Sequence, residues 1–570
     1  MEKYIIFKSY TEKVFFLIGM VCFSQLFISC NESFLDEVPL DRFSPENLLV
    51  DEAGFNTAVV ALYQAAREEH AIGGVNFDYM NLGTDIVEWG RPDGRGFKDY
   101  TLLNSQFDPV VGYWDWAYKS MVRQCNFILD NINKPEVKIE ESQRAYIAAQ
   151  AKFFRGYTYN VLAVLYGGVP IVDFQITEPK FDYQRATKEE VLRFAINDLE
   201  AAAADLPVVE NVSDGRIYKA AAYHLLAEVY ISLAMETGDV SFYDKSIAAA
   251  NKVINGEAGQ YQLMTERFGD LSRPGDVFSD LFWGNQQNRS SGNLEVIFAW
   301  QFESFTLGGG IGNGEGNINP RWWAPEQDRI RTPNGVINLR SDSLQRGIGV
   351  NSPTNYFKYD VWKLDPNDMR NSKYNIRREF YYNNPEDPEY FGKKILTGRD
   401  SNGKLVVALE DGTLTTQILD TLRMYYPWIR KIDGIPFNDD PVSGRSGNDI
   451  IRIRLAETYL LRAEAFLRKG DLQSAADDIN ILRNRAAAIP VSSGEIDIDF
   501  LLDERARELI VEEPRRRTLQ RMGLLYERVK KYNPPSGNTI QPHNELWPIP
   551  QKFIDSNTGA AIQQNPGYPQ

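Results

Sequence analysis

Histidine is scarce in this chain, which limits the acid–base and metal chemistry that it can support. The three histidines, His70, His224 and His543, lie far apart, and none has another His, a Cys or a carboxylate at the spacing of a zinc motif. His224 falls on an apolar helical stripe, so we interpret it as a packed or hydrogen-bonded side chain. No Gly-x-Ser-x-Gly nucleophile elbow occurs. The sequence therefore predicts no histidine-based metal site and no Ser-His-Asp enzyme.

Carboxylates and glycine-rich strings are the remaining candidates for catalysis or ion binding. Glycoside hydrolysis needs only two carboxylates beside the scissile bond, and the chain has 78 acidic residues, so a secreted glycoside hydrolase is the alternative to a binding protein. The run Gly308 to Gly316 lacks the Gly-Lys-Ser/Thr of a phosphate loop, and we interpret it as a flexible loop. Asp400, Asn402 and Gly403 lack the final Glu of a calcium loop, which favours a hairpin turn.

Tryptophans beside turn-forming residues indicate a ligand-binding surface. A sugar has an apolar C–H face and a rim of hydroxyls, so it is bound by flat rings and planar polar groups. Trp89 precedes the string Gly90-Arg91-Pro92-Asp93-Gly94, and Trp322 and Trp323 follow Asn319-Pro320, so we expect both sites to lie in loops. The predicted oligosaccharide site consists of these rings and three hydrogen-bonding side chains: Trp89, Trp322, Trp323, Arg91, Asn317 and Arg321.

Core packing is the competing interpretation of each of these three rings. A peptide ligand would use similar rings, so the aromatic residues do not by themselves distinguish a glycan from a peptide. Other tryptophans occupy helix-like, strand-like or motif contexts and are interpreted as core: Trp114, Trp116, Trp300, Trp428 and Trp547.

Net charge argues against nucleic acid as a partner. The formal charge is -16 and no basic stripe reverses it locally, so a phosphate backbone would be repelled. Arg515, Arg516 and Arg517 sit in a predicted helical segment beside Glu512 and Glu513, where we interpret them as paired charges.

The first thirty residues predict the compartment. Lys3, Lys8 and Lys13 precede a mostly apolar stretch from Val14 to Ile28, which has the length of a signal-peptide core. The junction Ser29-Cys30 resembles the lipobox of bacterial lipoproteins, although Phe27 stands where the commonest lipobox has Leu. Residues 1–29 are therefore expected to be removed and Cys30 to be acylated, whereas an ordinary secretory signal is the alternative. Cleavage would remove three Lys and two Glu, and the net charge would move from -16 to -17.

Cysteine usage agrees with this interpretation. Cys22 lies in the predicted signal and Cys30 would carry lipid, so Cys125 is left without a partner for an intrachain disulfide. The mature chain must then hold together through core burial.

Helical periodicity predicts a scaffold of helix pairs. The segment RIRLAETYLLRAEAFLRKG, residues 452–470, carries one apolar stripe, and a second stripe from Leu472 to Leu482 follows directly after Gly470. This is the shape of a tetratricopeptide unit, and a similar pair is expected over 215–254. Thr187 with Glu190 predicts a capping box, and Ser142 is expected to begin a long helix that reaches Tyr166.

Between about residues 256 and 449 the pattern changes. Gly, Pro, Asn and aromatic residues replace the helical stripes, and short strand-like runs such as 294–300 stand out. The large apolar side chains argue against disorder. The sequence predicts a mostly α protein with helical parts at about 30–255 and 450–570 and an ordered, loop-rich binding lobe between them.

Several segments, taken in order, resemble the SusD/RagB family of outer-membrane lipoproteins of Bacteroidetes-type bacteria. After Cys30 and ESFLDEVP, these are AKFFRGYTYNVLAVLYGGVPIV (151–172), RATKEEVLRFAINDLEAAAADLP (185–207), the 452–470 helix, ERARELIVEEPRRRTLQRMG (504–523) and ELWPIP (545–550). The resemblance spans nearly the whole mature chain and implies that residues 30–570 form a single domain. One departure is Glu513-Pro514, where the family usually has a glycine before its arginines.

The resemblance implies a function that composition does not show. It implies a surface-exposed, lipid-anchored protein of the outer membrane, whose tetratricopeptide-like helices dock onto a SusC-like TonB-dependent transporter. The loop-rich lobe would hold the nutrient, an oligosaccharide or polysaccharide in most members and a peptide in some. No cofactor and no reaction belong to the family, so the resemblance favours a binding protein over an enzyme.

Overall fold

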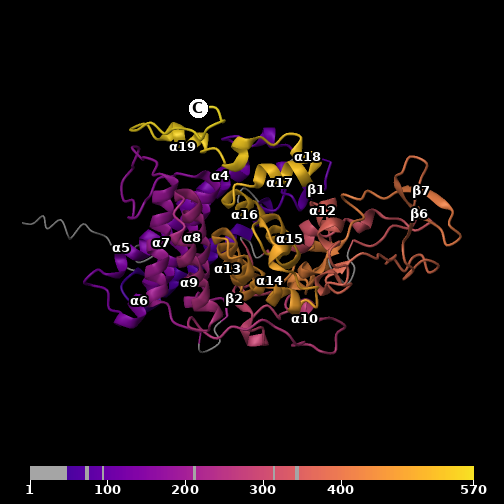
Figure 1. Cartoon of the computed structure of the whole chain (residues 1–570), viewed down its shortest axis with the longest axis horizontal. Helices are drawn as coiled ribbons and strands as arrows, with labels where there is room; N and C mark the ends of the chain where they lie inside the picture. The colour runs from indigo at the N-terminus through magenta and orange to yellow at the C-terminus, as the bar shows by residue number, and fades with distance from the viewer. Residues whose placement is uncertain (1–47, 71–75, 93–95, 210–213, 312–314, 341–345) are drawn as a thin grey trace, which may run out of the picture.

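Helices and irregular segments occupy different parts of the molecule, and a small sheet projects from one end (Figure 1). The computed structural model describes residues 48–70, 76–92, 96–209, 214–311, 315–340 and 346–570. The predicted signal peptide and Cys30 lie outside the described residues. Within the described ranges helices dominate and strands are short, so the predicted mostly α class is confirmed.

The helical elements have the following bounds. In the N-terminal part they are α3 (Glu52–Arg67), α4 (Asp108–Asp115), α5 (Arg123–Ile132), α6 (Glu141–Tyr166), α7 (Lys188–Asp205), α8 (Lys219–Thr237) and α9 (Ser241–Ile254). Short helices follow in the loop-rich part: α10 (Val277–Asp280), α11 (Asn319–Trp323) and α12 (Asn355–Tyr359). The C-terminal part contains α13 (Leu455–Lys469), α14 (Leu472–Arg485), α15 (Ile498–Leu509), α16 (Arg515–Arg521), α17 (Leu525–Tyr532), α18 (Pro534–Gly537) and α19 (Gln551–Ser556).

The helix pairs are separated in the sequence but adjacent in space. Helix α6 packs on α7, α7 on α8, α8 on α9, α9 on α13 and α13 on α14. Small, fully buried side chains such as Ala250 of α9 and Ala456 of α13 let the helix axes approach closely. The two predicted helix pairs are confirmed as α8–α9 and α13–α14, and the contact between α9 and α13 makes them one stack (Figure 1).

Helix ends follow local chemistry in most cases. Thr187 and Glu190 form the predicted capping box of α7, and Gly470 ends α13 with a left-handed φ of 81°. The expectation that Ser142 begins α6 is wrong, because the chain is already helical at Glu141 and the amide of Arg144 donates to the carbonyl of Glu140 at 2.9 Å.

Four small antiparallel sheets are present in the described ranges, and two of them, β1–β3 and β2–β9, connect the loop-rich part to the rest. The strands are β1 (Val87–Trp89), β2 (Val296–Trp300), β3 (Asn351–Pro353), β4 (Ile376–Arg377), β5 (Leu396–Arg399), β6 (Leu405–Ala408), β7 (Leu414–Ile418), β8 (Trp428–Ile429) and β9 (Ile450–Arg454). They pair as β1–β3, β2–β9, β4–β8 and β5–β6–β7. Strand β2 confirms the predicted strand near 294–300, and its partner β9 leads directly into α13. This sheet therefore ties the loop-rich part to the helix stack.

Buried arginines and carboxylates join the same parts. Arg454 Nη1, at the end of β9, lies 2.7 Å from Glu295 Oε1 and 2.6 Å from Glu508 Oε1 of α15. Arg370 Nη1, in the loop-rich part, lies 2.9 Å from Glu508 Oε2. All four side chains are at most 1% exposed. We call this set, with the acidic and basic groups that it contacts, the ion cluster.

The three arginines at 515–517 lie in α16 and are buried. Arg515 pairs with Glu513 at 3.3 Å, as the sequence predicts, but its closer partner is Asp85 at 2.7 Å, far away in the chain. Arg517 Nη2 pairs with Glu69 at 3.4 Å, whereas Arg516 donates to the hydroxyl of Tyr100 at 2.9 Å and has no carboxylate partner among the described residues. The paired-charge interpretation is therefore confirmed for Arg515 and Arg517 and wrong for Arg516. The pairs with Asp85 and Glu69 join the N-terminal part to the C-terminal part. None of the helices in the described ranges combines the length and the apolar composition needed to cross a membrane.

Candidate functional site

The predicted tryptophans lie in regular elements. Trp89 is the last residue of β1, opposite Asn351 of β3, and Trp322 and Trp323 lie in α11. The expectation that they lie in loops is therefore wrong. The local reason is that Asn317 Oδ1 accepts the amide of Asn319 at 2.9 Å and Pro320 occupies the first turn, so this turn-forming string starts a helix.

The three rings are largely buried. Trp89, Trp322 and Trp323 are 7%, 9% and 1% exposed. Trp323 Nε1 donates to Asp78 Oδ1 at 2.6 Å, and burial raises the pKa of Asp78 to about 7 against the opposing hydrogen bonds. In this structure the rings pack against the protein and do not form an open platform, so direct stacking of a ligand on them stays a prediction.

The predicted polar residues differ in accessibility. Asn317 is buried, and its Nδ2 donates to the carbonyl of Asn448 at 3.4 Å, so its amide supports the fold. Arg91 and Arg321 are half-buried. Arg321 Nη1 donates to the carbonyl of Ser443 at 3.3 Å.

Two arginines that the sequence analysis did not select lie close to Arg321. They are Arg346, whose Nη1 donates to the carbonyl of Val442 at 3.3 Å, and Arg445, whose Nη1 lies 2.8 Å from Glu315. Burial, followed by the charges of Arg346, Arg445 and Arg91, lowers the pKa of Arg321. The structure therefore brings four guanidinium groups together from three separate loops and α11.

Glycines next to these arginines explain how the loops approach each other. A Cβ on Gly90 would lie 2.4 Å from the carbonyl oxygen of Leu422, and one on Gly347 would lie 2.3 Å from that of Ala324. Gly444 has a φ of 69°, and a Cβ there would lie 2.4 Å from the carbonyl oxygen of Arg346. The pairs Gly90-Arg91, Arg346-Gly347 and Gly444-Arg445 are the sequence signal that could have identified this group.

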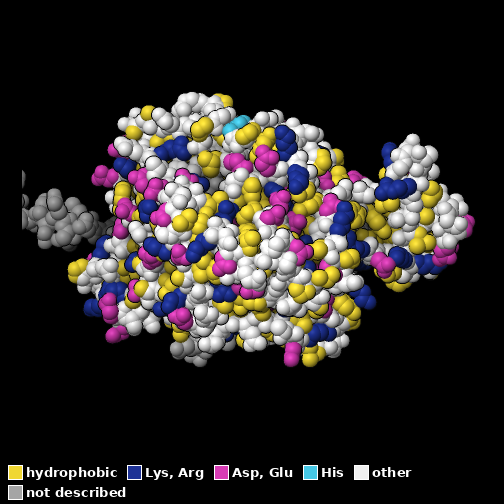
Figure 2. Space-filling view, viewed as in Figure 1, with side chains coloured by type: hydrophobic (Ala, Val, Ile, Leu, Met, Phe, Trp, Pro, Cys, Tyr) yellow, Lys and Arg dark blue, Asp and Glu magenta, His cyan; other side chains and the backbone are white. Residues whose placement is uncertain are grey.

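A wide cleft lies beside the loops that carry these arginines. It has a volume of about 940 Å³ and separates the projecting β5–β6–β7 sheet from the body of the molecule. Figure 2 shows a notch where this sheet leaves the body, with Lys and Arg side chains beside it. The charged and aromatic side chains that line it are Lys358, Tyr359, Arg378, Phe380, Arg399, Lys404, Asp420, Tyr425 and Tyr426.

The cleft and the arginine group share the segment 420–426. Leu422 lines the cleft, while its carbonyl faces Gly90. Tyr426 also lines the cleft, and its hydroxyl donates to the carbonyl of Trp323 at 3.0 Å. Trp323 and Gly90, which precedes Arg91, therefore lie behind one wall of the cleft.

The cleft offers aromatic rings and hydrogen-bonding side chains, which are the two kinds of group that bind a sugar. Tyr359 is 57% exposed and Tyr425 is half-buried, so these rings have accessible faces. Lys358 is buried, and burial lowers its pKa although Glu88 and Asp420 act in the opposite direction. Arg399 and Lys404 flank the turn at 400–403, where the predicted hairpin is confirmed by the pairing of β5 with β6.

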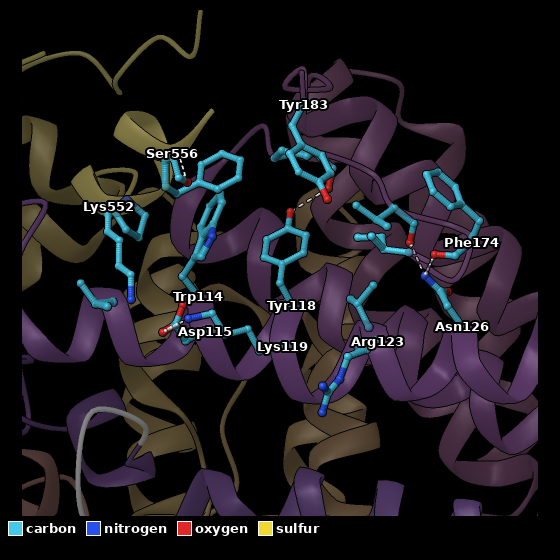
Figure 3. A pocket seen from close by; sticks show the side chains of 17 residues that line it. Trp114, Asp115, Tyr118, Lys119, Arg123, Asn126, Phe174, Tyr183, Lys552 and Ser556 are labelled. Atoms are coloured by element: carbon cyan, nitrogen blue, oxygen red, sulfur yellow. Dashed lines mark hydrogen bonds and ion pairs between the residues drawn. The ribbon is translucent and has the colours of Figure 1, made fainter. Parts of the chain in front are cut away.

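A second cavity, of about 490 Å³, lies in the helical part (Figure 3). Trp114 and Tyr118 line it from the helix that continues from α4 through a π-helical turn, Trp116–Val122, into α5. Tyr118 donates to the carbonyl of Pro170 at 2.7 Å, and Lys119 pairs with Asp115 at 2.6 Å, so these polar groups of the lining are engaged within the protein. The other tryptophans interpreted as core are confirmed as buried.

Histidine and acidic residues form no cluster suited to a metal in the ranges that the structure describes. His224 Nδ1 lies 2.8 Å from Thr458 Oγ1 in a buried contact, which confirms its interpretation as a hydrogen-bonded packing residue. Cys125 is buried as a free thiol.

Two family models match separate parts of the chain. A model described as "SusD family" matches residues 294–568, and one described as "Starch-binding associating with outer membrane" matches residues 55–231. Together they cover most of the loop-rich part, nearly all of the C-terminal part and most of the N-terminal helices.

Named relatives align over most of their own length. The starch-binding protein SusD of Bacteroides thetaiotaomicron is 24% identical over 512 residues, which cover 86% of this chain and 85% of the relative. SusD-like protein P2 of Formosa agariphila is 25% identical over 565 residues, which cover 95% and 97%.

Solved structures show the same fold. A laminarin-binding SusD-like protein superposes with a TM-score of 0.65 at 22% identity, covering 90% of this chain and 99% of that chain. A SusD homologue from Bacteroides thetaiotaomicron gives a TM-score of 0.69 at 20% identity, covering 92% and 99%. With the ordered sequence motifs, the family models and the fold in agreement, the chain belongs to the SusD/RagB family.

Proposed function

We propose that this protein binds a glycan in the cleft between the β5–β6–β7 sheet and the body, and that it does so without cleaving it. The observation that carries the proposal is the cleft itself, because it has the size of a ligand site and combines accessible tyrosine rings with guanidinium and ammonium donors. Tyr359 and Tyr425 would stack on the apolar faces of sugar rings, and the cations would bond the hydroxyls.

Relatives support a carbohydrate ligand. One is named a starch-binding protein, another a laminarin-binding protein, and a surface glycan-binding protein of the same fold has been solved in complex with laminarihexaose. These names describe those proteins. The present chain has its own arrangement of rings and charges, so the proposal names glycans as a class.

The predicted residues extend the proposed site. Arg91 and Arg321 would contact a longer glycan that crosses the 420–426 segment, while Trp89, Trp322 and Trp323 would support that surface from below. Asn317 would hold the turn that precedes α11. Under this proposal, Arg91→Gln and Arg321→Gln weaken binding of long oligosaccharides more than that of short ones.

We further propose that the protein is acylated at Cys30, is displayed on the outer membrane and delivers its glycan to a SusC-like TonB-dependent transporter. The apolar segment 14–28 followed by Ser29-Cys30 supports lipidation. The description "associating with outer membrane" of the matching family model supports the location. Affinity purification from native membranes should recover a TonB-dependent barrel in near-stoichiometric amount, and its repeated absence would contradict the partnership.

Calorimetry with a panel of neutral and acidic oligosaccharides tests glycan binding. Tyr359→Ala should weaken binding by about 1–3 kcal/mol, taking the stacking of a base on an aromatic ring as the guide. Tyr118→Ala, in the cavity of Figure 3, is the control and should leave the affinity unchanged. Loss of binding in the control but not in Tyr359→Ala would move the site to the helical part. Recovery of intact oligosaccharide after incubation would distinguish binding from hydrolysis.

A further inference from the structure

The cleft concentrates positive charge in a protein whose formal net charge is -16. Lys358, Arg378, Arg399 and Lys404 line it, whereas Asp420 is the acidic side chain among its lining residues. Asp420 Oδ1 accepts the amide of Leu422 at 2.9 Å, so this carboxylate caps its own turn.

These four cations lack carboxylate partners. Within the described part of the chain, no carboxylate oxygen lies within 4.0 Å of a nitrogen of Lys358, Arg378, Arg399 or Lys404. Arg399 Nη1 donates to the carbonyl of Gly403 at 2.6 Å, and Arg378 donates to the carbonyl of Lys358 at 3.1 Å and to Asn371 Oδ1 at 2.7 Å. None of the four therefore forms an ion pair with a described carboxylate, although Glu88 and Asp420 act on Lys358 at longer range.

Two lysines that directly precede the projecting sheet behave differently from Lys404. Lys393 Nζ lies 2.9 Å from Glu410, and Lys394 Nζ lies 2.5 Å from Glu379. These pairs lie outside the cleft lining. In and beside this sheet, the lysines outside the cleft are therefore paired, whereas the lysine that lines the cleft is not.

The burial of Lys358 is an independent observation that favours an anionic group in the cleft. Its side chain is 3% exposed, yet its Nζ has one hydrogen bond, a long one of 3.5 Å to the carbonyl of Thr421. An ammonium group carries three donors, and burying it without a counter-ion is costly. An anionic group in the cleft would supply the missing acceptors.

We propose that the cleft recognises an acidic oligosaccharide, with a uronate carboxylate or a sulfate ester held by Lys358, Arg378, Arg399 and Lys404; this inference rests on the proposed glycan-binding function. The planar forks of the two arginines suit bidentate contacts with either anion. Tyr359 and Tyr425 provide the ring faces for the sugars that carry the charge. A neutral glycan would leave Lys358 buried and unpaired, which gives the site a physical basis for selectivity.

Calorimetric titration of the mature chain with three families of oligosaccharide tests this inference. The families are uronate oligomers, sulfated galactan oligomers and neutral β-glucan oligomers, each at low and high NaCl. We expect one acidic family to bind at least tenfold more tightly than the neutral family at low salt, with the preference shrinking as salt screens the charges. The two acidic families distinguish a carboxylate from a sulfate as the recognised group.

The variant Arg399→Gln/Lys404→Gln should lower affinity for the preferred acidic oligomer about tenfold and leave any neutral binding unchanged. Its matched control is Lys393→Gln/Lys394→Gln, which removes the same charge from the segment that directly precedes the sheet and should leave affinity unchanged. Circular dichroism of both variants checks that the sheet remains folded.

Three results would overturn the inference. Neutral oligomers that bind as tightly as acidic ones, without salt dependence, would refute acidic selectivity and leave the proposed glycan binding intact. Equal losses in the variant and in its control would show a general charge effect and not recognition in the cleft. Failure of every oligosaccharide family to bind would refute the glycan-binding function together with the inference.

Discussion

Replacing Glu508 by Gln should destabilise the protein strongly, because Glu508 is the central carboxylate of the ion cluster. Its Oε1 lies 2.6 Å from Arg454 and also contacts Arg485, and its Oε2 lies 2.9 Å from Arg370. The Glu508 side chain is 0% exposed. The glutamine would keep one acceptor oxygen but would place an amide NH₂ group against a buried guanidinium.

The expected magnitude follows from what remains after the change. Removing one partner of a buried ion pair costs about 3–5 kcal/mol, since the other charge is left uncompensated. Arg454 and Arg485 still keep Glu295, and Arg370 still keeps Glu504. Because each arginine retains another carboxylate, we expect a loss near the lower end of that range, about 3 kcal/mol in the free energy of unfolding.

Urea unfolding followed by tryptophan fluorescence measures this loss as a lower midpoint at an unchanged slope. Glu410→Gln is the control, because Glu410 and Lys393 form an exposed pair with side chains 70% and 45% exposed. An exposed pair is worth about 0–1 kcal/mol. If Glu508→Gln costs no more than Glu410→Gln, the ion cluster does not stabilise the fold and the reasoning is wrong.

Three further predictions concern pH, a buried acid and the membrane anchor. Burial alone would raise the pKa of Glu504, but nearby arginines lower it to about 2. The stability that ionised Glu504 contributes is therefore complete above the unfolded pKa of 4.5 and should be lost as pH falls from 4.5 towards 2. A urea midpoint that stays constant over this pH range would contradict the prediction. Burial raises the pKa of Asp78 to about 7, so the stability that this group contributes to the wild type falls as pH rises from 3.8 to 7. If Asp78→Asn keeps the hydrogen bond from Trp323, its urea midpoint should rise relative to that of the wild type between pH 5 and pH 8. An equal difference between variant and wild type at both pH values would refute this. Cys30→Ala should leave the outer-membrane fraction and should not incorporate labelled palmitate, and continued membrane partition of this variant would refute acylation at Cys30.

Local sequence patterns predicted the helical scaffold well. Apolar stripes and the glycine after Lys469 identified α13 and α14, and the Thr187–Glu190 box identified the start of α7. These features depend on interactions between residues three to five positions apart, which are visible in the sequence. The order of motifs also identified the family.

Burial of the aromatic residues could not be predicted in the same way. Trp322 and Trp323 stand next to turn-forming residues but lie in α11 and pack inward, whereas Tyr359 is the ring that is exposed at the cleft. Whether a ring is covered depends on segments far away in the chain. For Trp323 these include Asp78 and the 420–426 segment.

The sequence by itself determined where the long scaffold helices lie, which of their faces are apolar and which family the chain resembles. Only the tertiary structure decided that α9 packs on α13 and that glycine contacts bring Arg91, Arg321 and Arg346 together. It also decided that unpaired cations from distant segments meet in one cleft. The physical reason is that periodicity encodes which face must be buried, while the partner that buries it, and the charges left without a partner, are set by long-range packing.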